Sequence, residues 1–192
     1  IAGGITRVAL MPDQNPVLDE PGIVQRAALA AKPDLWVHPL AAATRGLSGA
    51  ELGEYAMMRK AGARAVATGR GWIADSGVMM KVMTYAASLG MTLITHAEDA
   101  GLVGAAVATA SETATRLGLA SAPAEAEALA IARDVMLAEL TGVRLHFRKV
   151  TTAKGLDIVR MAKSKGLPVT CGIGPSQAST SSTTSSKAPA RT

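Results

Sequence analysis

The sequence predicts an α/β protein of about six consecutive βα units, arranged as an open doubly wound sheet or as an incomplete (β/α)8 TIM-type barrel. Three observations predict this class. Six short runs rich in Val, Ile or Leu are continuous rather than alternating, which is typical of parallel strands buried on both faces. Segments of helical character separate the runs. Several of these segments end in a glycine just before the next run, at Gly62, Gly90, Gly142 and Gly166, where a left-handed helix cap is favoured.

The predicted strands, in order, are residues 5–10, 35–40, 63–67, 91–95, 143–147 and 167–173. Helices are expected over residues 49–60, 78–89, 123–140 and 154–165. Six parallel strands are too few to close an eight-stranded barrel, so a barrel requires two strands that this chain lacks. The stretch between Asp99 and Ser121 is longer than a usual βα connection, and we expect it to carry a helix over the strand ends.

The helix over residues 123–140 has the most complete signals. Ser121 can cap its start, Pro123 suits its first turn, and Gly142 suits its end. Apolar residues recur with helical spacing and form one stripe, which consists of Leu129, Ala132, Met136 and Leu140.

Composition indicates one folded domain followed by a tail. Of the 192 residues, 48% are hydrophobic and 3% aromatic, so a core of small and aliphatic side chains is expected over residues 1–174. Residues 175–192 are dominated by Ser and Thr, have no periodicity, and are expected to be disordered. Because the chain opens at Ile1, inside an apolar stretch, we expect that the start of a larger protein is missing.

Charge and cysteine content narrow the function classes. The net charge is +5, but the basic residues are scattered and aromatic residues are few, which argues against a nucleic-acid partner. No apolar run approaches the roughly 18 residues that span a bilayer, which argues against a membrane partner. The single cysteine, Cys171, excludes an intrachain disulfide and fits a cytoplasmic location.

Two histidines stand where βα-repeat proteins place their active sites. His96 and His146 both come at the ends of predicted strands, and the carboxyl ends of parallel strands form the functional face. Neutral imidazole is a preferred zinc ligand, so both are candidate metal ligands. The alternative is that each ring bonds a backbone carbonyl. His38, which precedes Pro39 on another strand, is expected to be structural.

Four segments occur in an order that resembles a known family. They are Met-Pro-Asp-Gln-Asn-Pro at 11–16, Thr-His-Ala-Glu-Asp at 95–99, the stretch 116–127 with Pro-Ala-Glu-Ala-Glu at its end, and Leu-His-Phe-Arg-Lys-Val-Thr-Thr at 145–152. Together they resemble the dihydroorotases of the amidohydrolase superfamily, particularly the type I and multifunctional-complex group. The resemblance covers roughly residues 3–173.

This resemblance implies a distorted (β/α)8 barrel that holds one or two zinc ions, with the six strands as barrel strands two to seven. It implies reversible hydrolysis of dihydroorotate to N-carbamoyl-L-aspartate in pyrimidine biosynthesis. His96 and His146 match metal-ligand histidines of the fifth and sixth barrel strands. Asp13 falls where the family has a substrate-contacting Asn, which makes it a candidate substrate-binding residue.

The sequence also departs from the family pattern. The His-x-His pair of barrel strand one and the general acid/base Asp of strand eight have no counterpart here. Gly69 and Arg70 stand where strand four has a metal-bridging Asp or carboxylated Lys, and residues 174–177 replace a Thr-Pro-His-His segment. Two histidines are one short of the three protein ligands usual for catalytic zinc, so we expect that this chain alone hydrolyses nothing.

Two alternatives therefore stay open beside the zinc-dependent dihydroorotase. Some non-catalytic members of the family associate with aspartate transcarbamoylase, and Asp13 and Arg70 favour such a scaffold. A sibling allantoinase or hydantoinase is the other alternative, although those enzymes usually need the carboxylated lysine. Under any of these functions an unclosed barrel has two unpaired strand edges, so the chain alone is expected to be insoluble or a homo-oligomer.

Overall fold

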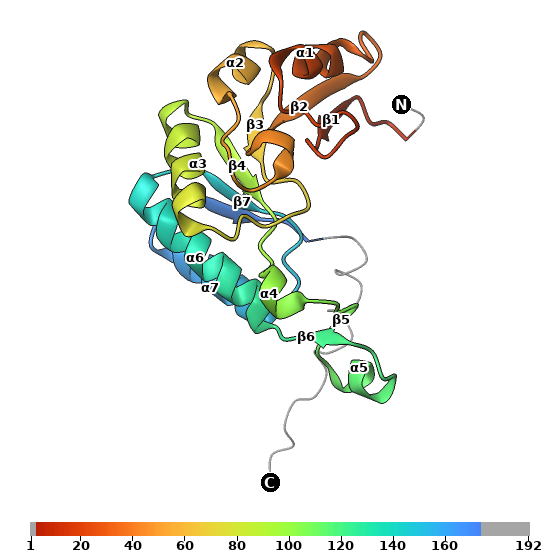
Figure 1. The fold of residues 1–192 in the computed structure, drawn as a ribbon, viewed down its shortest axis with the longest axis vertical. Coiled ribbons are helices and arrows are strands. Elements are labelled where there is room, and N and C mark those ends of the chain that lie inside the picture. Colours follow the sequence, from red (N-terminus) through yellow and green to blue (C-terminus); the bar gives the residue numbers. More distant parts are fainter. Residues whose placement is uncertain (1–2, 174–192) are drawn as a thin grey trace.

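The computed structural model describes residues 3–173, which form an incomplete barrel of six parallel strands with helices along one face (Figure 1). The spatial order β1-β2-β3-β4-β7-β8 follows the order in the chain. These strands are β1 (Arg7–Leu10), β2 (Trp36–Ala42), β3 (Ala65–Ala67), β4 (Thr92–Thr95), β7 (Leu145–Phe147) and β8 (Val169–Cys171). All six predicted strands are confirmed. The predicted tail at 175–192 lies outside the described residues.

Helices connect consecutive strands and pack side by side on the outer face of the sheet (Figure 1). They are α1 (Pro21–Leu29), α2 (Tyr55–Lys60), α3 (Ser76–Ser88), α6 (Glu125–Thr141) and α7 (Ala153–Ser164). The main core lies between these helices and the sheet, and it contains fully buried Tyr55, Phe147, Met83 and Leu93. No helix within residues 3–173 is long and apolar enough to cross a membrane.

The predicted helix at 49–60 is only half right, because α2 begins at Tyr55. A short 3-10 turn (Arg45–Leu47) precedes it, and Leu52 pairs with Thr44 in an isolated antiparallel bridge. At Gly53 a Cβ atom would come within 2.7 Å of the Ala42 carbonyl oxygen. The loop at Gly53 therefore packs so closely against the end of β2 that no side chain fits there. A helix over residues 49–54 would need room for side chains on every side.

The predicted helix at 123–140 is confirmed as α6, but its apolar stripe faces outward. Leu129, Met136 and Leu140 are 50%, 66% and 72% exposed. The buried face instead consists of Ala126, Ala130, Ile131, Asp134 and Ala138. Small alanine side chains allow α6 to pack closely against its neighbours, which explains why the larger apolar residues lie on the outside.

The long connection after β4 contains two short helices and a small parallel sheet rather than one helix. These elements are α4 (Ala100–Val103), β5 (Ala108–Thr109), α5 (Glu112–Arg116) and β6 (Ser121–Ala122). Figure 1 shows β5, β6 and α5 extending away from the main sheet. The stretch does contain helix, but the expectation of one helix over the strand ends is wrong, because two short helices form and α5 lies away from the main sheet.

Candidate functional site

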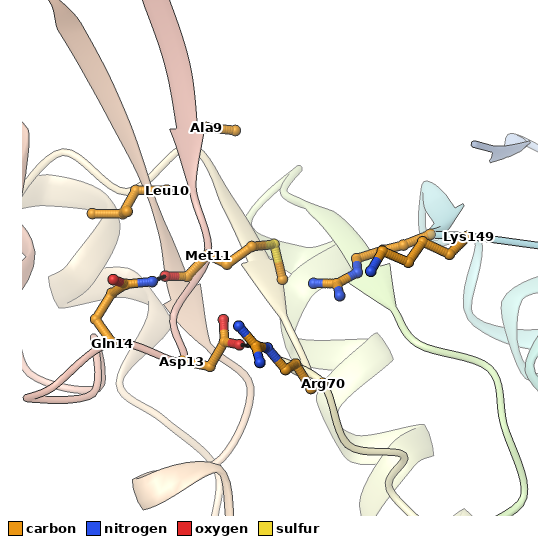
Figure 2. A pocket seen from close by; sticks show the side chains of 8 residues that line it. Ala9, Leu10, Met11, Asp13, Gln14, Arg70 and Lys149 are labelled. Atoms are coloured by element: carbon orange, nitrogen blue, oxygen red, sulfur yellow. Dashed lines mark hydrogen bonds and ion pairs between the residues drawn. The ribbon is translucent and has the colours of Figure 1, made fainter. Parts of the chain in front are cut away.

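A cavity of about 750 Å³ opens at the carboxyl ends of the strands. Its lining comes from β1 and the loop after it, from the loop after β3, and from the loop after β7 (Figure 2). The lining residues are Ala9, Leu10, Met11, Asp13, Gln14, Arg70, Arg148 and Lys149. Because the carboxyl ends of parallel strands converge on one rim, residues far apart in the chain meet here.

Asp13 and Arg70, the two residues that depart from the family pattern, pair with each other. The Arg70 Nε donates to Asp13 Oδ2 at 2.7 Å (Figure 2). The Asp13 side chain is 16% exposed and Arg70 is 85% exposed. Among residues 3–173, Asp13 Oδ1 is buried without a hydrogen-bond partner. The pair neutralises both charges at this edge of the cavity and leaves the second carboxylate oxygen of Asp13 buried and unpartnered among the described residues.

His96 and His146 lie on neighbouring strands and face the same side of the sheet. His146 pairs in register with Ile94 of β4, and His96 follows Ile94 by two residues. Side chains two residues apart on a strand point the same way. From strand spacing and rise, their Cα atoms are about 8 Å apart.

Both imidazoles have a polar partner. His146 Nδ1 is 2.8 Å from Thr170 Oγ1, and burial lowers the pKa of His146, which favours the neutral ring. His96 Nε2 is 2.9 Å from Glu98 Oε2, while its Nδ1 is buried without a partner among residues 3–173. Neither ring bonds a backbone carbonyl in the described part of the chain, contrary to the structural alternative.

The donors that this face brings together do not fit a complete zinc centre. Within residues 3–173 no group of three or more His, Cys, Asp or Glu side chains could hold a metal ion. The third histidine, His38, lies opposite Ala9 in β2, four residues before that strand ends. None of the three histidines is among the residues that line the cavity. The rim instead carries Arg70, Arg148 and Lys149, which repel a cation.

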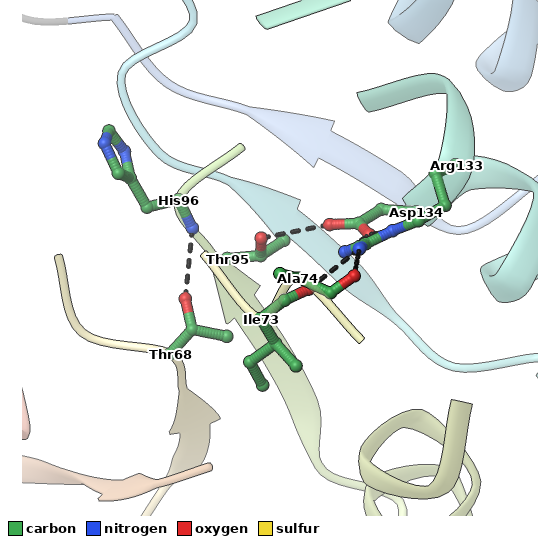
Figure 3. A network of polar contacts seen from close by, with 7 residues as sticks. All are labelled: Thr68, Ile73, Ala74, Thr95, His96, Arg133 and Asp134. Atoms are coloured by element: carbon green, nitrogen blue, oxygen red, sulfur yellow. Dashed lines mark hydrogen bonds and ion pairs between the residues drawn. The ribbon is translucent and has the colours of Figure 1, made fainter. Parts of the chain in front are cut away.

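A buried ion pair behind β4 supports the position of His96 (Figure 3). Asp134 is fully buried, accepts from Thr95 Oγ1 at 3.1 Å, and accepts from Arg133 at 3.0 and 2.6 Å. Burial raises the pKa of Asp134, and the Arg133 guanidinium offsets part of this rise. Figure 3 shows the Thr95 and His96 side chains leaving the strand on opposite sides, while the His96 amide donates to Thr68 Oγ1 at 3.2 Å.

Arg133 also ties α6 to the loop after β3. Its Nη1 donates to the carbonyls of Ile73 and Ala74 at 2.8 and 3.1 Å, and its guanidinium lies 4.2 Å from the centre of the Trp72 ring. The network therefore joins β4, α6 and the loop that carries Arg70. Sequence reasoning missed it because charged helix residues are usually exposed. The signal was that Asp134 follows Ala130 and Ile131 by four and three residues, on the helix face that is buried.

Glu127 fixes the loop that follows β7. Its carboxylate accepts from the backbone N–H and the hydroxyl of Thr151 at 2.8 and 2.7 Å, and from the same groups of Thr152 at 2.9 and 2.7 Å. A Cβ at Gly155 would come within 2.5 Å of this carboxylate. The Pro-Ala-Glu-Ala-Glu segment and the Val-Thr-Thr segment therefore meet as a structural clamp beside Lys149.

Comparison with known protein sequences gives a consistent family. The family described as dihydro-orotase-like matches residues 1–155. The chain is 38% identical over 176 residues to a dihydroorotase from Caldanaerobacter subterraneus subsp. tengcongensis, and 40% identical over 178 residues to one from Syntrophotalea carbinolica. It is 36% identical over 178 residues to a dihydroorotase-like protein from Pseudomonas aeruginosa. The matches cover 90–91% of this chain but only 41% of each relative.

Comparison with solved structures gives the fold. An L-hydantoinase from Arthrobacter aurescens matches with a TM-score of 0.69 and 23% identity, over 90% of this chain and 40% of the hydantoinase. A D-hydantoinase from a Bacillus species matches with a TM-score of 0.68 and 18% identity, over 91% of this chain and 40% of that structure. The chain thus has the architecture of part of such barrels.

Proposed function

Since this chain belongs to the dihydroorotase-like family, we propose that its full-length protein is a cytoplasmic cyclic amidohydrolase that converts dihydroorotate to N-carbamoyl-L-aspartate in pyrimidine biosynthesis. The observation that supports this proposal is the strand-end cavity. Its walls come from the 11–16 and 145–152 segments, the same segments that resemble dihydroorotases. Strand ends are where proteins of this architecture place their chemistry.

Asp13 is the proposed substrate-binding residue. Its Oδ1 has no partner among the described residues, and Arg70 fixes the other oxygen. A cyclic amide presents ring N–H groups, and the unpartnered carboxylate oxygen would accept a hydrogen bond from one of them once a rotation of the side chain turns it toward the cavity. Asp13 would therefore orient the ring, whereas the neutral amide of the usual Asn could either donate or accept.

His96 and His146 are the proposed metal ligands, and zinc is the proposed metal. The two imidazoles share one face of the sheet, and burial favours the neutral form of His146. They do not make a catalytic zinc site by themselves, because such sites have three protein ligands. Any further ligands would come from parts of the full-length protein outside this chain. We accordingly propose that residues 1–192 alone hydrolyse no cyclic amide.

The test compares the full-length protein with residues 1–192 for turnover of dihydroorotate, with allantoin and hydantoin as control substrates. We expect turnover of dihydroorotate by the full-length protein only, together with loss of bound zinc in its His96→Ala variant. A matched His38→Ala variant should retain its zinc, because His38 lies within β2, four residues before the carboxyl end of that strand. Turnover by the short chain, or full zinc content in His96→Ala, would contradict the proposal.

A second candidate function is a non-catalytic scaffold that associates with aspartate transcarbamoylase. The Asp13–Arg70 ion pair favours it, because it places a fixed cation where the family has a metal-bridging group. Gel filtration of the full-length protein with and without aspartate transcarbamoylase tests this function. A stable complex without dihydroorotate turnover supports the scaffold, and turnover without a complex excludes it.

A further inference from the structure

We propose that the strand-end cavity binds a small dianion with two carboxylate groups through Arg148 and Lys149, and that it does so without a metal ion. The inference rests on the proposed function only for the location of the ligand and the choice of probe. It concerns binding, so it is independent of whether the full-length protein catalyses a reaction.

The first argument is the charge of the cavity. Its lining carries one acidic residue, Asp13, and three basic residues. Arg70 is already paired with Asp13. Within residues 3–173 neither Arg148 nor Lys149 forms an ion pair. In the described part of the chain, two positive charges therefore line the cavity without a paired acid, and an anion with two charges matches them.

The second argument is the backbone at Lys149. Its φ angle is +55°, in the left-handed region that residues with a Cβ rarely adopt. Hydrogen bonds hold the residue on both sides: the Arg148 N–H donates to the Thr95 carbonyl at 3.0 Å, and the Val150 N–H donates to the Gly172 carbonyl at 2.9 Å. Figure 2 shows the Lys149 side chain extending into the opening from the side opposite Asp13 and Arg70. Maintained strain of this kind occurs at ligand sites.

The third argument is the rigidity of the loop. Beyond Val150, which is buried, the Glu127 carboxylate holds Thr151 and Thr152 through four hydrogen bonds. The two cationic side chains thus project from a backbone that is fixed before a ligand arrives. A preorganised loop loses less entropy on binding than a flexible one.

The chemistry of the two side chains defines the ligand class. A guanidinium presents a planar fork of donors that matches a carboxylate, and an ammonium group binds a second carboxylate as a point charge. A cavity of about 750 Å³ holds a molecule of a few carbon atoms easily. The negative charge of Asp13 repels an acidic group on its side of the cavity. This repulsion favours a ligand that directs both carboxylates toward Arg148 and Lys149.

The experiment is calorimetric titration of the full-length protein with N-carbamoyl-L-aspartate in the presence of a chelator. N-carbamoyl-L-alanine, which lacks the second carboxylate, and inorganic phosphate serve as comparison ligands. We expect binding of the dianion that survives chelation and weakens with added salt. Arg148→Met and Lys149→Met should each weaken it about tenfold or more. Lys163→Met, an exposed change on α7 away from the cavity, should leave it unchanged.

Each outcome decides the inference separately from the enzyme. Binding that persists without metal while dihydroorotate turnover is absent supports the inference and contradicts the catalytic proposal. Binding that disappears with the chelator overturns the inference and leaves metal-dependent catalysis standing. Equal affinity for the monoanion or for phosphate overturns the two-carboxylate ligand class. Unchanged affinity in both methionine variants removes Arg148 and Lys149 from the site.

Discussion

Lys149→Gly should make the protein more stable and weaken its binding of the dianion. Lys149 is exposed, so its removal sacrifices little packing, and its φ of +55° is a conformation that glycine adopts freely. The left-handed backbone destabilises the folded state by about 1–2 kcal/mol when the residue has a Cβ. Glycine avoids this strain, but its greater freedom in the unfolded chain costs about 0.5–1 kcal/mol of stability. A net gain of up to about 1 kcal/mol corresponds to a rise in Tm of about 2–4 °C for a domain of 150–250 residues, and to a smaller rise for a longer protein.

Thermal unfolding of the full-length protein without anion measures the gain, and titration with the dianion measures the loss of affinity. Lys149→Met is the matched control, because it removes the charge but keeps the Cβ in the strained conformation. It should weaken dianion binding as much as Lys149→Gly does, without raising the Tm. A lower Tm for the glycine variant, or unchanged affinity in both variants, would refute the reasoning that strain is retained here for binding.

Three further predictions test other parts of the structure. Asp134→Asn removes the carboxylate partner of the partly buried Arg133 guanidinium and should reduce the free energy of unfolding by about 3–5 kcal/mol, measured by denaturant titration; a loss below about 1 kcal/mol would contradict the network. Asp13→Asn should release Arg70 and remove a repelling charge, so calorimetry should show severalfold tighter dianion binding. Burial lowers the pKa of His146 below 6.5 in the folded protein. Between this lowered pKa and about 6.5, the unfolded state therefore binds more protons than the folded state. The free energy of unfolding should fall as the pH drops through and below 6.5. His146→Gln, which can keep a hydrogen bond to Thr170, should reduce that fall in unfolding measurements above and below this pH.

The strands could be predicted from the sequence because a buried parallel strand needs a continuous apolar run, and each run here is bounded by a glycine or a polar turn. Helix faces were harder to predict. The stripe from Leu129 to Leu140 has correct helical spacing, yet α6 buries its alanines and Asp134. Periodicity detects an apolar face but does not decide which of two such faces packs against the sheet when one of them consists of small residues.

The candidate site could be predicted only in part, because its geometry depends on contacts between distant segments. His96 and His146 could be selected as candidates because both stand near the carboxyl end of an apolar run, His96 just after β4 and His146 within β7. The ion pair of Asp13 and Arg70 joins loops 57 positions apart, and spacing along the chain does not reveal it. Lys149 stood in a recognised motif, but its left-handed backbone and its position on the cavity wall depend on hydrogen bonds to β4 and to the segment after β8.

The charge pattern at the strand ends reconciles membership of the family with the absence of a complete zinc site in the described chain. In metal-dependent hydrolysis, the ion both attracts the anionic substrate and converts a bound water into a nucleophile. Guanidinium and ammonium groups at the same rim can attract the anionic substrate. They cannot convert water into a nucleophile, because they do not hold it in a hydroxide-like form. Arg148 and Lys149 therefore fit the proposed binding of an anionic ligand, whereas its hydrolysis would need metal ligands from outside the described residues. For the same reason, Arg70→Glu should weaken dianion binding in calorimetry of the full-length protein, and it should not give residues 1–192 turnover of dihydroorotate.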